Sequence, residues 1–220
     1  MYLSQINFNN FRCLNDKRIE LDRYFNLIYG KNGQGKTSLI EAVHFLATGK
    51  SFRTKKIKEM LKYNTNRIIV FGKYIDKNGD ENSLAIDLNE DKKTFYINRN
   101  KDKYIEYVGK LNIISFIPED IEIIMGNPGV RRGFFNYEIS QARRDYLEAI
   151  VNFEKILRIR NKMIKAKETG EEIYKIYNER FIEEGVKIII HRREFIKKLS
   201  ILLNLNYRKL FDEKSELKLK

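Results

Sequence analysis

Alternating hydrophobic and polar residues predict β-strands in the N-terminal part of the chain. A period of two places successive side chains on opposite faces of a sheet, so that one face can be buried. Residues rich in Asn, Asp and Gly separate the later segments, which favours an antiparallel meander. The predicted strands are Tyr2–Asn9, Lys17–Leu21, Arg67–Ile75, Ser83–Leu88 and Thr94–Ile97, with turns at Lys77–Asp80 and Asn89–Asp91.

A continuous apolar run precedes a glycine-rich loop. Phe25–Tyr29 is the kind of run that a buried central strand needs. The loop Gly30–Thr37 follows directly, and apolar residues then recur at helical spacing from Leu39 to Leu46. Gly49 stands where such a helix would end. The sequence therefore predicts a strand, a loop and a helix in this order.

From about residue 143 the pattern changes to that of two long helices. A repeat of seven residues favours a partner helix, and the second helix carries one at Tyr174, Phe181, Ile188, Phe195 and Leu202. The first helix offers a matching stripe that Arg160 interrupts, and residues 168–172 form the break between the two. We interpret the break as a hairpin tip and the pair as an antiparallel, coiled-coil-like arm. An ordinary helical subdomain is the alternative.

Charge adds a class of partner to this picture. The chain has 220 residues, of which 43 are basic and 30 acidic, so that its formal net charge is +13. Such a surface favours a polyanion, with nucleic acid first and anionic lipid second. The chain has one cysteine, no secretory signal pattern and no apolar run long enough to span a bilayer. We therefore expect a cytoplasmic, nucleoid-associated protein without a membrane partner.

The loop after the first apolar run matches G-x-x-x-x-G-K-[ST], a pattern that wraps backbone N–H groups around nucleotide phosphates. Its glycines allow the backbone to approach phosphate oxygens, its lysine reaches the β- and γ-phosphates, and its last hydroxyl is placed to ligate Mg²⁺. We therefore predict an ATP and Mg²⁺ site, with a relic loop as the alternative. The loop consists of Gly30, Lys31, Asn32, Gly33, Gln34, Gly35, Lys36 and Thr37.

Several segments together resemble the RecF family of bacterial DNA repair proteins. The first group comprises Asn9–Arg12, the loop Gly30–Thr37, Glu41–Ala42 and Leu46–Thr54. A second group follows at Phe116–Asp120, Gly126–Pro128, Arg131–Arg132 and Ser140–Leu147. The resemblance extends over about residues 1–165. The glycine-rich loop alone would also suit many SMC-like ATPases, so the combination of segments carries the resemblance.

The resemblance implies an α/β fold: a P-loop ABC-type ATPase head, whose mixed sheet includes the antiparallel meander, with a helical arm. Residues 1–142 would form the N-terminal part of the head and residues 143–220 the arm. By position, Arg12 would lie near the nucleotide. Arg53 would sense DNA or phosphate. Lys55, Lys56 and Lys58 lie in the densest basic stretch of the sequence, residues 50–67, which we expect to contact DNA phosphates.

The resemblance also implies partners. RecF-like proteins bind ATP and DNA, dimerise around nucleotide, and assist RecO and RecR in loading RecA during recombinational repair, replication restart and SOS induction. Single-stranded, double-stranded and gapped DNA would be bound without sequence specificity. Other readings stay open, namely a P-loop kinase or transporter ATPase for a small molecule, or a basic helical scaffold with a relic loop.

Some parts of the family pattern are absent from the sequence. A Ser-Gly-Gly-Gln signature and an apolar strand ending in Asp-Glu do not occur, so we expect a chain truncated before these segments, with little ATP hydrolysis of its own. Asn136 stands where the pattern usually has aspartate, and Gly133 where it has a bulkier residue.

Overall fold

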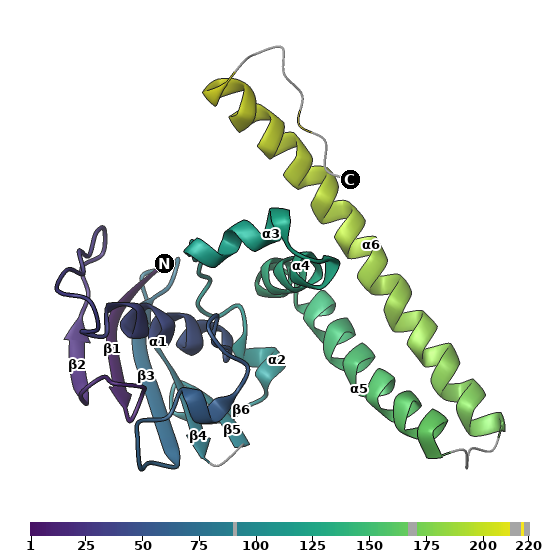
Figure 1. The fold of residues 1–220 in the computed structure, drawn as a ribbon, viewed down its shortest axis with the longest axis horizontal. Helices are drawn as coiled ribbons and strands as arrows, with labels where there is room; N and C mark the ends of the chain where they lie inside the picture. The colour runs from purple at the N-terminus through teal and green to yellow at the C-terminus, as the bar shows by residue number, and fades with distance from the viewer. Residues whose placement is uncertain (90–91, 167–170, 212–216, 218–220) are drawn as a thin grey trace. The chain divides into compact units, whose positions relative to one another are not determined.

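A computed structural model of the chain describes residues 1–89, 92–166, 171–211 and 217 (Figure 1). The residues fall into two compact units, Met1–Ile117 and Pro118–Lys220. The first unit is a sheet with a covering helix, and the second is helical. Within these residues no helix is long and apolar enough to cross a membrane.

The sheet of the first unit confirms the strands predicted from alternation. Its order is β2-β1-β3-β4-β5-β6, and each neighbouring pair is antiparallel. The predicted meander is β3, β4 and β5, although Glu90 and Asp91 of its second turn lie outside the described residues. The strands are β1 (Tyr2–Asn9), β2 (Lys17–Glu20), β3 (Arg67–Ile75), β4 (Glu81–Asn89), β5 (Lys92–Ile97) and β6 (Asn100–Asp102).

The last strand, β6, was not predicted, because only three residues form it. A two-residue turn reverses the chain between Ile97 and Asn100, which face each other in the ladder. Both turn residues, Asn98 and Arg99, have positive φ values of 49° and 69°. Positive φ at two successive residues is the geometry of a tight hairpin with the natural strand twist.

Helix α1 (Lys36–Thr48) packs on one face of the sheet and ends at Gly49, as the sequence predicts. Phe45 and Leu46 of α1 are fully buried, together with Ile68 and Ile86 of the central strands. A Cβ at Gly72 of β3 would lie 2.4 Å from Leu46 Cδ2, so the helix approaches the sheet where a side chain is missing. Glycine in a strand often marks such a close approach.

Two short helices complete the first unit. They are the 3₁₀ turn η1 (Ile57–Glu59) and α2 (Tyr104–Tyr107). The buried Tyr107 hydroxyl donates a hydrogen bond of 2.5 Å to the carbonyl oxygen of Leu46, near the end of α1. Burial raises the pKa of Tyr107 well above its usual value. The hydroxyl therefore stays neutral and ties α2 to α1.

The apolar run Phe25–Tyr29 is not a buried central strand, and the prediction is wrong on this point. It forms no strand, and Phe25 and Tyr29 are 73% and 85% exposed. A run becomes a central strand only where neighbouring strands accept its backbone hydrogen bonds and other elements cover its side chains. No described strand pairs with these residues. A second apolar run, Ile113–Ile117, likewise forms no strand.

The second unit consists of helices. Asn127 caps helix α4 (Pro128–Ala142), because its side chain accepts a 2.8 Å hydrogen bond from the Gly129 N–H. Pro128 is the first residue of this helix. Glu119 and Asp120 lie in the first turn of a helical segment. The helices are η2 (Pro118–Ile121), α3 (Glu122–Met125), α4 (Pro128–Ala142), α5 (Arg144–Ala166) and α6 (Glu171–Leu210).

The core of the second unit joins α4, α5 and α6, and its buried residues are Ile139, Tyr146, Ala149, Ile150 and Ile188. Because α4 shares this core with the two long helices, the compact units divide at 117/118. The change in sequence pattern at 142/143 marks instead the start of α5.

The two long helices run antiparallel, as predicted for the arm (Figure 1). Near one end Tyr146 of α5 contacts Arg192 of α6, and near the other Arg160 contacts Tyr174. Phe153 and Phe181 stack between these ends, with ring centroids 4.5 Å apart. The predicted hairpin tip includes residues 167–170, which lie outside the described residues.

Candidate functional site

The glycine-rich loop leads directly into the N-terminus of α1. Gly30, Gly33 and Gly35 have φ values of 147°, 80° and 89°, in the range that favours glycine. A Cβ at Gly35 would lie 2.8 Å from Leu14 Cδ2, so this position also lacks room for a side chain. The first turn of α1 contains no acidic residue. Its free N–H groups and helix dipole therefore favour an anion.

The Lys36 side chain folds back onto the start of the loop. Its Nζ donates hydrogen bonds of 2.8 Å to the carbonyl oxygens of both Gly30 and Lys31. An ammonium group has three donors, so these two bonds leave one for another acceptor. The contacts hold the positive charge beside the N-terminus of α1.

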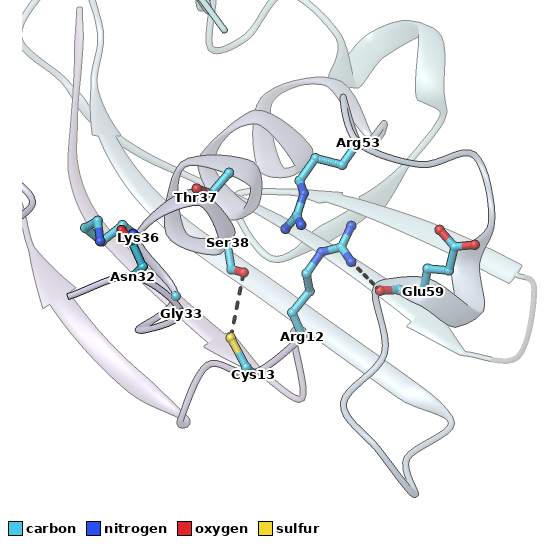
Figure 2. A pocket seen from close by; sticks show the side chains of 10 residues that line it. Arg12, Cys13, Asn32, Gly33, Lys36, Thr37, Ser38, Arg53 and Glu59 are labelled. Atoms are coloured by element: carbon cyan, nitrogen blue, oxygen red, sulfur yellow. Dashed lines mark hydrogen bonds between the residues drawn. The ribbon is translucent and has the colours of Figure 1, made fainter. Parts of the chain in front are cut away.

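A cavity of about 460 Å³ opens next to the loop (Figure 2). Arg12, Arg53 and Glu59 lie on the side opposite Lys36 in this view, and Cys13 and Ser38 lie between the two sides. The loop contributes Asn32, Gly33, Gly35, Lys36 and Thr37 to its wall. The cavity is therefore bordered by cations and by the N-terminus of a helix.

A buried carboxylate holds Arg12 in place. Arg12 donates to Glu41 through Nε at 2.5 Å and Nη2 at 2.6 Å, and through Nη1 to the carbonyl oxygen of Glu59 at 2.6 Å. Glu41 is fully buried, whereas 15% of the Arg12 side chain is exposed. Arg53 reaches the same carboxylate at 3.4 Å. The pair is bidentate, which fixes the plane of the guanidinium group.

The structure brings together most of the residues predicted for nucleotide binding. Arg12 and five loop residues line one cavity, with Thr37 exposed at its wall. Gly30 and Lys31 contribute through their carbonyl oxygens to Lys36, as described above. Gln34 lies in the exposed part of the loop and is not among the lining residues.

The basic residues predicted for DNA contact divide into two groups. Arg53 lines the cavity and pairs with Glu41. Lys55 and Lys58 are exposed, and Lys56 is exposed with its Nζ 3.3 Å from Glu59 Oε1. The DNA role of all four stays a prediction.

Glu41 was not predicted as part of the site, although the sequence carries a signal for it. Positions 38, 41, 42, 45 and 46 follow the spacing of one helix face, and all five are buried. A carboxylate on such a face needs a charged or hydrogen-bonding partner. An acidic residue on the apolar side of the helix after the loop could therefore have been singled out.

The fold and the loop define the class of this chain as a P-loop protein, with the loop directly before a helix. The chain belongs to the RecF/RecN/SMC N terminal domain family, whose pattern matches residues 2–129. This match includes the loop and all of the first unit after Met1.

Relatives in two bacteria are named "DNA replication and repair protein RecF". The chain is 30% identical to that of Symbiobacterium thermophilum over 220 residues, all of this chain and 59% of the relative. It is 33% identical to that of Halothermothrix orenii over 217 residues, 96% of this chain and 58% of the relative. The chain thus spans less than two thirds of the length of these relatives.

A solved structure shows the same fold. It is described as "Structure of the recombination mediator protein RecF-ATP in RecFOR pathway". The match has a TM-score of 0.90 and 32% sequence identity, and covers 96% of this chain and 58% of that chain. The α/β architecture and the helical arm are therefore those of a RecF-type protein.

Proposed function

We propose that this chain binds ATP with Mg²⁺ in the cavity beside Gly30–Thr37. The observation that carries the proposal is the arrangement of Lys36, the N-terminus of α1 and Arg12 around one cavity. Each supplies N–H donors to an anion, and triphosphate is the anion that this loop pattern typically binds. The similarity to a structure described as RecF-ATP supports the choice of nucleotide.

The residues present suit a nucleotide with its metal ion. Gly33 has nothing within 4 Å of the place where a Cβ would be, so the loop surface is open at this point. The Thr37 hydroxyl is exposed at the cavity and would hold Mg²⁺. When bound, Mg²⁺ would neutralise phosphate charge, while Lys36 and the loop N–H groups orient the phosphates.

We further propose that the chain acts on DNA as a RecF-type repair protein in the cytoplasm, at the nucleoid. The net charge of +13 and the exposed lysines at 55, 56 and 58 support contact with the DNA backbone. Backbone contacts carry no base information, so single-stranded, double-stranded and gapped DNA would be bound without sequence preference. The proposal includes an ATP-dependent homodimer, RecO and RecR as partners in loading RecA, and roles in replication restart and SOS induction.

The test is binding of this chain to a gapped duplex, with and without ATP and Mg²⁺, over a series of salt concentrations. We expect ATP to strengthen binding in the wild type and to have no effect in Lys36→Ala, which loses the charge at the loop. We also expect affinity to fall steeply with salt, because each neutralised phosphate releases counterions. A gapped-duplex affinity that depends neither on ATP nor on salt would contradict the proposal.

A further inference from the structure

We propose that Glu41 is a positioning residue, which fixes the guanidinium groups of Arg12 and Arg53 at the edge of the cavity. This inference rests on the proposed nucleotide binding and concerns how the cavity is prepared for phosphate. Glu41 is not among the residues that line the cavity. Its effect on a ligand would therefore pass through the two arginines that do line it.

The contacts of Glu41 account for both carboxylate oxygens. Oε1 accepts from Arg12 Nη2 at 2.6 Å and from Ser51 Oγ at 2.5 Å. Oε2 accepts from Arg12 Nε at 2.5 Å and from Arg53 Nη1 at 3.4 Å. A buried carboxylate is costly unless its lone pairs are filled by donors of this kind. Four donors from three residues converge on this one group.

The geometry restricts Arg12 to one orientation. A guanidinium group has five N–H donors in a fixed plane. Glu41 takes two of them, and the Glu59 carbonyl oxygen takes one at 2.6 Å. Two N–H groups then remain for a further acceptor. A lysine could not be held in this way, because its ammonium group has no planar fork.

Glu41 also allows the positive guanidinium groups of Arg12 and Arg53 to lie close together. Arg12 and Arg53 extend toward each other in Figure 2, and both contact Glu41. The carboxylate offsets one of the two positive charges, so the group of three keeps a net charge of +1. Lys36 supplies a further cation on the opposite side of the cavity in Figure 2. A ligand with several phosphate oxygens could contact both sides at once.

The same carboxylate anchors the basic stretch that follows α1, residues 50–67. Ser51 and Arg53 belong to this stretch, and their side chains bind Glu41. The Arg12 backbone N–H donates to the Met60 carbonyl oxygen at 2.8 Å, and this bond ties the stretch to the backbone at Arg12. By contrast, the side-chain contacts of Lys36 stay within the loop. Loss of Glu41 would therefore loosen the arginines while leaving Lys36 in place.

The test is a double-mutant cycle on the affinity for ATP with Mg²⁺, using wild type, Glu41→Gln, Arg12→Ala and the double variant. We expect Glu41→Gln to weaken ATP binding about tenfold, because the amide cannot hold the bidentate pair. The double variant should lose less affinity than the sum of the two single losses, because part of the Glu41 effect passes through Arg12 and only the remainder passes through Arg53. Glu41→Asp, which keeps the charge, should recover part of the loss.

Thr48→Ala is the matched control, because Thr48 is also buried on α1 but bonds only backbone near the helix end. It should leave ATP affinity unchanged. If Glu41→Gln does not fold, Arg12→Lys carries the test, since it keeps the charge and loses the fork. We expect about tenfold weaker binding there too.

Wild-type affinity in Glu41→Gln, or in Arg12→Lys where that variant carries the test, would overturn the inference. So would losses from Glu41→Gln and Arg12→Ala that simply add. A wild-type chain that binds no ATP would instead contradict the proposed nucleotide binding, so the two failures are distinguishable.

Discussion

Two partly buried arginines, one in each compact unit, are held by different chemistry. In the first unit Arg12 is paired with the buried carboxylate of Glu41 at the edge of a cavity. In the second unit Arg160 lies 4.4 Å from the Phe181 ring centroid, and its Nη2 bonds the neutral Tyr174 hydroxyl and Asn178 side chain. Within the described residues its buried Nε has no hydrogen-bond partner.

Arg192, also in the second unit, has neutral hydrogen-bond partners like those of Arg160. Its Nη2 donates to Asn136 Oδ1 at 2.7 Å and its Nε to the Tyr146 hydroxyl at 3.1 Å. Asn136, where the family pattern led us to expect aspartate, thus serves as a neutral acceptor. A carboxylate thus holds Arg12 at the edge of a cavity, whereas Arg160 and Arg192 bond neutral side chains between packed helices.

The largest expected effect is on stability of the first unit. Glu41→Ala should cost about 3 kcal/mol, because it leaves Arg12 and Arg53 together without their counterion. Chemical denaturation with hydrogen exchange of peptides from α1 would measure this loss. Unchanged hydrogen exchange in α1 would show that the Glu41 carboxylate is not needed for stability. It would contradict the difference drawn between Arg12 and the arginines with neutral partners.

A smaller effect is expected from removing one hydroxyl in the second unit. Tyr146→Phe should cost about 1–2 kcal/mol, because Arg192 Nε loses its acceptor and Asn136 loses a donor. Burial raises the pKa of the Tyr146 phenol, so the hydroxyl remains a neutral donor at ordinary pH. Urea denaturation followed by circular dichroism of the helices checks the loss, and full wild-type stability would contradict it.

Replacing the arginine among aromatic rings should matter less. Arg160→Met keeps an extended side chain against Phe181 and removes a charge for which the described residues supply no carboxylate partner. We expect a loss of no more than about 1 kcal/mol, since the cation–π attraction is offset by relief from desolvation. Thermal denaturation measures this change. A loss as large as that of Glu41→Ala would erase the distinction between the two arginines.

The smallest expected effect depends on pH. The backbone N–H of Asn10 and then the Asn9 side chain hold the pKa of Asp16 below its usual value. A depressed folded-state pKa gives stability above the ordinary pKa, which is lost as pH falls through the folded-state value. Asp16→Asn should therefore cost less than about 0.5 kcal/mol at neutral pH, since Asp16 is exposed.

Denaturation of wild type and Asp16→Asn over a pH series is the measurement for this prediction. The difference between the two should shrink toward acid pH. A difference in the free energy of unfolding that grows as the pH falls would contradict the lowered pKa of Asp16.

The sequence predicted the sheet well because β1, β3 and β4 each have one buried face, and alternation reports that directly. The loop and α1 were predicted because their glycines and helical spacing are local. Phe25–Tyr29 was misassigned because an apolar run shows what a segment could bury and not which strands lie beside it. Glu41 was missed as a site residue because its partners are 29 positions earlier at Arg12 and 10 later at Ser51.

The sequence pattern places a boundary at 142/143, whereas the compact units divide at 117/118, because the division depends on tertiary contacts. The seven-residue repeat identifies α5 and α6 as partners, whereas the membership of α4 in their core depends on the tertiary contact of Ile139. Arg160 was noted as an interruption of the stripe. Only the structure shows that the Phe181 ring covers it.

The most direct measurement of the central claim uses Cys13, the one cysteine of the sequence, whose exposed side chain lines the cavity. The rate at which a neutral alkylating reagent modifies Cys13 should fall at least about fivefold with saturating ATP and Mg²⁺, because bound nucleotide blocks access. Inorganic triphosphate should protect as well, adenosine should not, and Lys36→Ala should abolish protection. An equal alkylation rate with and without ATP in the folded wild-type chain would contradict nucleotide binding at this cavity.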